Sequence, residues 1–164
     1  TNMVKIALKY KPSYICLVPE KRNEITTEGG LNLNKNRNKI KKIINVFNSN
    51  NIRTSLFINP SLQDIKLSKI LGSKCIEIHT GKISNQIKQK KNYSRELNKI
   101  KKCATYAKNI GLEVHAGHGM DYKTTKILNK IKQIEEFNIG HFIIGESVSH
   151  SISKVVKQFI KILR

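Results

Sequence analysis

The sequence has little cysteine, few acidic residues and no long apolar run. Its 164 residues include three cysteines, Cys16, Cys75 and Cys103, whose spacing forms neither a disulfide framework nor a zinc motif. This content favours a reducing compartment. The apolar runs are far shorter than the roughly 18 residues of a membrane-spanning helix, and no secretion signal is recognisable at the start of the chain. We therefore expect a cytoplasmic protein that does not associate with a membrane.

Acidic residues are outnumbered, with 11 Asp and Glu against 31 Lys and Arg and a net charge of +20. Such a charge can indicate a nucleic-acid partner. The basic residues are spread along the whole chain, however, and are not gathered with aromatic residues into one segment. Lysine, asparagine and isoleucine are over-used throughout, as in residues 36–42, which is the pattern expected from AT-rich codons. A basic protein that associates with nucleic acid without catalysis is therefore an alternative that the charge pattern does not favour.

Five short apolar runs, typical of strands, alternate with segments of helical periodicity. The runs cover residues 14–18, 54–58, 75–79, 112–116 and 141–144. Helical spacing of apolar residues follows each run, within 40–47, 62–71, 97–107, 127–134 and 152–163. Gly72 and Gly111 stand where a glycine commonly ends a helix. The alternation predicts an α/β fold with a parallel sheet. No linker interrupts it, so we expect a single domain over residues 1–164, with a polar, mobile loop over 81–92.

A glycine-rich turn after the first expected strand is also missing. A dinucleotide-binding fold would have G-x-G-x-x-G there, whereas the sequence reads Pro19-Glu20-Lys21-Arg22. This favours part of a (β/α)8 barrel, with five of its eight βα units, over an open doubly wound sheet, although both stay possible on this ground alone. A barrel aldolase would need a lysine inside a strand, and the strand centres contain none. Another phosphate-binding barrel enzyme, such as an isomerase, is a further alternative.

Polar residues and glycines gather at the carboxyl ends of the expected strands, which is the edge where parallel α/β folds bind ligands. They are Thr26, Thr27, Gly29 and Gly30, then Glu77 and His79, then Gly117, His118 and Gly119, and finally Gly145, Glu146 and Ser147, while Gly140 and His141 stand at the start of the fifth expected strand. The paired threonines and glycines suit an anion, and 145–147 precedes the last helix, whose N-terminus could bind phosphate. His118, held between two glycines, suits a proton donor or acceptor. We expect His115 and His150 to be core or surface histidines.

Six blocks together resemble the pyridoxine 5′-phosphate synthase family, in its order and at near-family spacing. They are Leu17–Arg22, Thr26–Leu31, Ser55–Ile58, Ile76–Gly81, Ala116–Gly119 and Asn138–Gly145. The resemblance implies a (β/α)8 barrel that forms a homo-oligomer, typically an octamer, and that needs no metal or organic cofactor. It also implies condensation of two small phosphorylated substrates, 1-deoxy-D-xylulose 5-phosphate and 3-amino-2-oxopropyl phosphate. The products would be pyridoxine 5′-phosphate, phosphate and water, in vitamin B6 biosynthesis.

The resemblance also assigns roles to individual residues. His118 matches the family's proton-donating histidine, and Gly119 matches a ligand contact beside it. Gly140 and His141 match the pair that binds the aminoacetone phosphate. Thr27 matches a contact to the deoxyxylulose phosphate, or the adjacent Thr26 does if the register differs by one residue. Glu77, His79 and Gly145 are weaker candidates at the same edge.

The sequence departs from the family in two ways. The family barrel has three further βα units before the point that matches Thr1, and they carry two of its three principal acid–base groups. We therefore expect this chain alone to be inactive or only weakly active, as a fragment, a split gene product or a degraded copy would be. In addition, His115 stands where the family commonly has asparagine, and Glu146 stands where it often has arginine. These two changes are expected to weaken phosphate binding.

Overall fold

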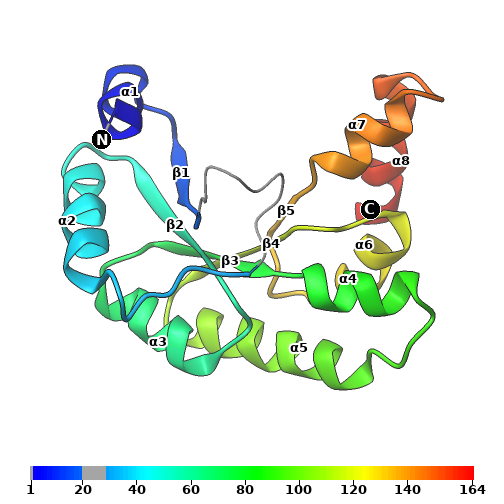
Figure 1. Ribbon diagram of the computed structural model, residues 1–164, viewed down its shortest axis with the longest axis horizontal. Helices are drawn as coiled ribbons and strands as arrows, with labels where there is room; N and C mark the ends of the chain where they lie inside the picture. Colours follow the sequence, from blue (N-terminus) through cyan, green and yellow to red (C-terminus); the bar gives the residue numbers. More distant parts are fainter. Residues whose placement is uncertain (1, 20–28) are drawn as a thin grey trace.

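The computed structural model describes residues 2–19 and 29–164, and its centre is one sheet of five parallel strands (Figure 1). The strands are β1 (Tyr14–Leu17), β2 (Arg53–Ile58), β3 (Cys75–His79), β4 (Glu113–Gly117) and β5 (Glu136–Asn138). Each strand pairs with the next one along the chain, in the order β1-β2-β3-β4-β5. This order has no switch point, unlike that of a doubly wound sheet. The strands form a half-barrel, which confirms the predicted α/β fold with part of a barrel.

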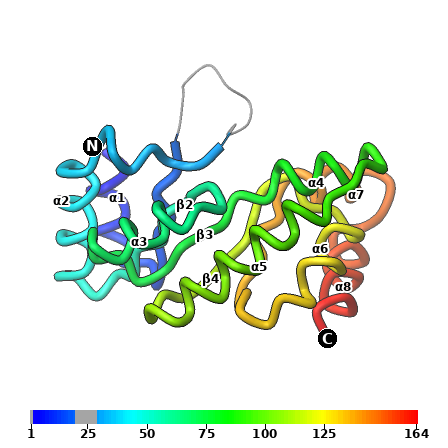
Figure 2. Tube along the Cα trace, turned by 90° about the horizontal axis from the view of Figure 1, so that it is seen from below, coloured from blue at the N-terminus to red at the C-terminus, as the bar shows by residue number. Residues whose placement is uncertain are grey.

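Helices connect the strands and flank the sheet. They are α1 (Asn2–Tyr10), α2 (Arg37–Asn48), α3 (Leu62–Ile70), α4 (Gly81–Lys88), α5 (Ser94–Asn109), α6 (Tyr122–Leu128), α7 (His141–Ser147) and α8 (Ile152–Leu163). Gly72 and Gly111 follow α3 and α5 with φ angles of 88° and 73°, as predicted for glycines that end helices. The N- and C-terminal parts of the chain lie at opposite ends of the sheet (Figures 1 and 2). Within the described residues, no helix has the length and apolar character needed to cross a bilayer.

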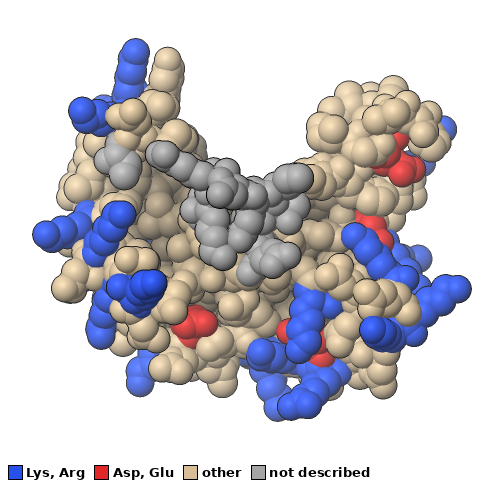
Figure 3. Space-filling view, viewed as in Figure 1, with Lys and Arg blue, Asp and Glu red and all other residues tan. Residues whose placement is uncertain are grey.

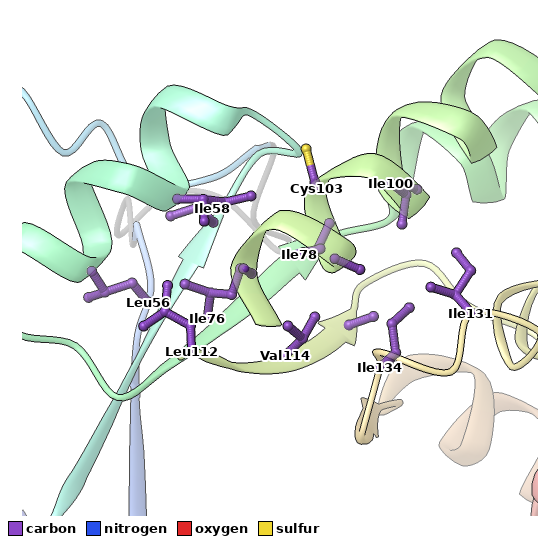
Figure 4. Packing of buried hydrophobic residues seen from close by; sticks show 14 of the residues in the cluster. Leu56, Ile58, Ile76, Ile78, Ile100, Cys103, Leu112, Val114, Ile131 and Ile134 are labelled. Carbon is purple, nitrogen blue, oxygen red and sulfur yellow. The ribbon is translucent and has the colours of Figure 1, made fainter. Parts of the chain in front are cut away.

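The hydrophobic core lies between one face of the sheet and the helices (Figure 4). Because side chains alternate along a strand, Ile76 and Ile78 of β3 join this core, whereas Glu77 between them points to the other face. Helix α5 supplies the opposing surface with Ile100, Cys103, Ala104 and Ala107. Each fully buried aliphatic side chain contributes about 1.5–3 kcal/mol. The helices thus pack on one face of the central strands, and the polar side chains such as Glu77 lie on the opposite face.

The prediction of a strand over residues 141–144 is wrong. This run begins α7, and the fifth strand is Glu136–Asn138, which pairs with β4. A run of four apolar residues cannot by itself distinguish a strand from a helix. Packing decides here: the ring of Phe142 lies edge-on against the rings of Tyr122 and Phe159, while Ile144 is 63% exposed.

The expected loop over 81–92 is also wrong, because its first eight residues form α4. Ile83 and Ile87, spaced as on one helical face, are buried in this helix, and the many polar residues around them concealed the pattern. The helix predicted within 127–134 lies earlier in the chain, since α6 covers Tyr122–Leu128. Ile131 and Ile134 enter the core from the segment after it. Residues 2–10, for which no helix or strand was predicted, form α1.

Candidate active site

His118 lies directly after β4, in a left-handed backbone conformation with a φ of 85°. Such a conformation costs a residue other than glycine about 1–3 kcal/mol and persists only where neighbours hold it. The hydroxyl of Thr80 holds it here, because it donates to the carbonyl oxygens of Gly117 and His118 at 2.8 and 2.7 Å. The imidazole of His118 stacks on that of His79, with ring centroids 4.8 Å apart. The loop after β3 therefore fixes the position of this histidine.

A cavity of about 400 Å³ opens beside His118. Its lining comes from the ends of β4, β5 and α4 and from α7, and it comprises Lys88, His118, Gly119, Met120, Asn138, Ile139, Gly140, His141, Phe142, Gly145 and Glu146. The structure thus brings together His118, Gly119, Gly140, His141 and Gly145, which the sequence predicted as site residues. The cavity has the volume of a small-molecule site.

The surroundings of His118 favour its neutral form. Burial lowers the pKa of this imidazole, and the nearby positive charges of His141 and Lys88 lower it further. The ammonium group of Lys88 donates to the carbonyl oxygen of Gly119 at 2.9 Å, so it is anchored beside the histidine. A neutral imidazole can accept a proton from a bound ligand. A phosphorylated ligand would raise the pKa of His118 through its negative charge, which would prepare it to donate a proton.

Glu77 occupies the polar face of β3, where its side chain is buried. Its carboxylate accepts hydrogen bonds from the amide of Asn138 at 3.0 Å and from the thiol of Cys16 at 3.5 Å. Burial raises the pKa of this carboxyl, although the hydrogen bond from Cys16, the charge of His115 and the amide of Asn138 partly oppose the rise. A side chain at residue 117 would collide with the carboxylate of Glu77, which explains the glycine at this position.

The remaining predictions about site residues differ in their outcomes. Thr26 and Thr27 lie outside the described residues. His79 does not line the cavity but packs between the rings of His118 and Phe57. Gly145 lines the cavity from within α7, so it precedes the last helix as predicted but does not belong to the N-terminus of that helix. The N-cap of α8 is instead Ser151, whose hydroxyl accepts from the backbone N–H of Lys154 at 3.4 Å.

Two residues of this region were not predicted. Lys88 is one lysine among many in a segment that was expected to be a loop, and nothing in the sequence distinguishes it from its neighbours. Asn138 does carry a signal, because it begins the block Asn138–Gly145 and ends a strand. Its pairing with Gly117 explains how it reaches Glu77. Donor types suited to a metal ion occur away from this cavity, near the N-terminal ends of β3 and β4.

Comparison with known proteins identifies the family. A family model described as "Pyridoxal phosphate biosynthesis protein PdxJ" matches residues 1–164. The chain belongs to the PdxJ family. It is 61% identical over 161 residues to pyridoxine 5′-phosphate synthase of Pelagibacter ubique, covering 98% of this chain and 67% of that protein. It is 45% identical over 162 residues to the synthase of a Sulfurihydrogenibium species, covering 99% of this chain and 66% of that protein. The chain thus spans about two thirds of the length of these PdxJ relatives.

Proposed function

We propose that this chain acts in pyridoxine 5′-phosphate synthesis, the activity for which its relatives are named. The reaction would condense 1-deoxy-D-xylulose 5-phosphate with 3-amino-2-oxopropyl phosphate and release phosphate and water. The observation that carries the proposal is the cavity in which His118, held in a strained backbone conformation, lies beside Gly140 and His141. Strain of this kind is typical of functional positions.

The proposed roles follow from the groups that line the cavity. His118 is the catalytic acid–base group, since ring formation requires imine formation, dehydration and loss of phosphate, each with a proton transfer. Gly140 and His141 bind the aminoacetone phosphate, and Lys88 adds a positive charge on the same side. Gly119 contacts the ligand beside His118. For Thr27, or Thr26, the proposed contact to the deoxyxylulose phosphate rests on the family resemblance alone.

The proposed site needs a complete barrel. Five strands leave β1 and β5 with one neighbouring strand each among the described residues. Closing an eight-stranded barrel requires three more. We propose that residues 1–164 form one domain that acts with the βα units found in the remaining third of its relatives. We propose a homo-oligomer in the cytoplasm for that complete form.

The experiment that tests the function uses a hybrid protein. This chain replaces the matching two thirds of the Pelagibacter ubique synthase, to which it is 61% identical. The purified hybrid is given both substrates, and pyridoxine 5′-phosphate and released phosphate are measured. We expect both products in equal amounts, and we expect the 164-residue chain alone to form little or none.

A matched pair of variants assigns the chemistry to one residue. In the hybrid, His118→Asn removes the acid–base group and should lower the rate by at least about 100-fold. His150→Asn changes an exposed histidine outside the cavity and should leave the rate unchanged. A folded hybrid that forms no product would overturn the proposed function. Full activity of His118→Asn would overturn only the role of this histidine.

A further inference from the structure

A second group of reactive side chains lies on the polar face of the sheet, near the N-terminal ends of β3 and β4. It consists of Cys75, Glu113 and His115, here called the β3–β4 cluster. Cys75 pairs directly with Glu113 across the two strands. His115 follows Glu113 by two residues and therefore points to the same face. Cys75 and His115 are buried, with 0% and 2% of their surfaces exposed.

The donor atoms of the β3–β4 cluster converge. The Nε2 atom of His115 lies 3.1 Å from Oε1 of Glu113, and Sγ of Cys75 lies 3.7 Å from Oε2 of the same carboxylate. One atom from each residue lies within 4.8 Å of the other two. Tetrahedral zinc, with bonds of about 2.0–2.3 Å, holds its ligands roughly 3–4 Å apart. Small side-chain movements would therefore bring all three donors around one ion.

The neighbours of the cluster are arranged to orient its ligands. The second ring nitrogen of His115, Nδ1, lies 3.5 Å from a carboxylate oxygen of Glu136. Histidines that bind metals commonly use their other nitrogen in this way. The carboxylate of Glu113 accepts from the hydroxyl of Tyr14 at 2.7 and 2.8 Å and pairs with Arg53 at 3.2 Å. Both ligands are thus fixed by groups that would not themselves contact the ion.

The local charge favours a cation, although the chain carries +20 overall. Glu77, Glu113 and Glu136 all lie on this face, and Arg53 forms an ion pair with Glu113. Without an ion, burial raises the pKa of the Cys75 thiol to about 12, and the charge of Glu113 adds to the rise. A bound divalent cation would reverse this effect, because coordination deprotonates a thiol.

We propose that Cys75, Glu113 and His115 form a binding site for a divalent cation of the zinc type. Sulfur, nitrogen and one carboxylate suit zinc, whereas magnesium and calcium prefer oxygen ligands alone. A water molecule would occupy the fourth position. The ion would join β3 to β4 at the end of the sheet opposite His118, so it enters no step of the proposed reaction. Sequence spacing concealed this site because its cysteine and glutamate are 38 residues apart.

Cobalt(II) is the probe that tests this site, because a cobalt–thiolate bond gives a near-ultraviolet absorption band. The 164-residue chain, freed of metal and reduced, is titrated with cobalt(II) and then with zinc. We expect one equivalent of cobalt to produce the band and zinc to abolish it. Cys75→Ser should abolish the band. Cys103→Ser and Cys16→Ser are the matched controls and should retain it, because neither cysteine belongs to the β3–β4 cluster.

A third variant guards against a folding defect. Glu136→Gln leaves the three ligands intact but weakens the group that orients His115. It should lower the cobalt affinity by about 10- to 100-fold and retain the band, with an unchanged circular dichroism spectrum. A folded chain that gives no band would overturn the proposal. A band that survives Cys75→Ser, or that disappears in Cys16→Ser, would also overturn it by locating the ion elsewhere.

Discussion

The cavity beside His118 contains an unusual balance of charges at the scale of single residues. Glu146 lines it at the position where the family resemblance led us to expect arginine, and a carboxylate there opposes a bound phosphate. Lys88 lines the same cavity from α4 and is anchored on the carbonyl oxygen of Gly119. We infer that Lys88 offsets Glu146, so that the cavity keeps a cation next to the proposed phosphate position.

This charge arrangement predicts the titration of His118. Lys88→Gln removes one of the charges that lower the pKa of His118, so the pKa should rise and the protonated form should persist to higher pH. Lys126→Gln, on the exposed face of α6 and outside the cavity, should leave it unchanged. The chemical shift of the imidazole Cε1 proton, followed by NMR as the pH is varied, measures both. Identical titration of His118 in the two variants would show that Lys88 does not act on it.

Residue 117 is a second position at which a single residue matters, because glycine leaves room there for the carboxylate of Glu77. A Cβ atom there would collide with the carboxylate of Glu77, which Asn138 and Cys16 hold in place. We expect Gly117→Ala to lower the free energy of unfolding by about 1–3 kcal/mol. Gly145→Ala adds the same methyl group in α7, where nothing lies within 4 Å of it, and should stabilise the chain by up to about 1 kcal/mol. Urea unfolding measures both, and equal effects would contradict the argument.

At the scale of elements, the assignment of residues 141–144 to α7 predicts how substitutions in this run affect the unfolding free energy. In a central strand both isoleucines of this run would be candidates for the core, whereas in α7 Ile144 is 63% exposed and Ile78 of β3 is fully buried. We therefore expect Ile78→Ala to cost about 2–5 kcal/mol of unfolding free energy and Ile144→Ala to stay within about 0.5 kcal/mol of the parent. Thermal and urea unfolding test this. A large loss of unfolding free energy in Ile144→Ala would instead favour a strand over residues 141–144.

The contrast between β3 and α7 shows what the sequence can predict. β3 alternates isoleucine with polar residues and is bounded by a helix-ending glycine, so its range was predicted correctly over 75–79. The run 141–144 has no such alternation, and its conformation depends on contacts with Tyr122 and Phe159 that sequence spacing does not reveal. The candidate site shows the same contrast between local sequence patterns and tertiary contacts. His118, between glycines, carries a local signal, whereas Lys88 acquires its position only through the packing of α4.

At the scale of the whole molecule, charge and topology have opposite effects on association. Among the described residues, β1 and β5 each have one unpaired edge, which favours contact with other chains. A net charge of +20 instead keeps copies of the chain apart. Among the described residues that line the cavity, Lys88 is the one lysine or arginine. In Figure 3 the basic side chains spread over the left flank and the lower right of the visible face, with few acidic side chains between them. On this face the distribution offers a polyanion many separate contacts.

The spread of charge predicts how this chain binds nucleic acid. At low salt it should bind single-stranded DNA of any sequence, and the logarithm of the affinity should fall linearly and steeply with the logarithm of the salt concentration. Fluorescence anisotropy with labelled oligonucleotides of different composition measures both properties. His118→Asn should bind DNA like the parent chain, because the proposed reaction site takes no part in this binding.

A preference for one DNA sequence that survives at physiological salt would instead require contacts to base edges. The non-catalytic binding function, which the spread of the basic residues along the sequence did not favour, would then become the better account of this chain.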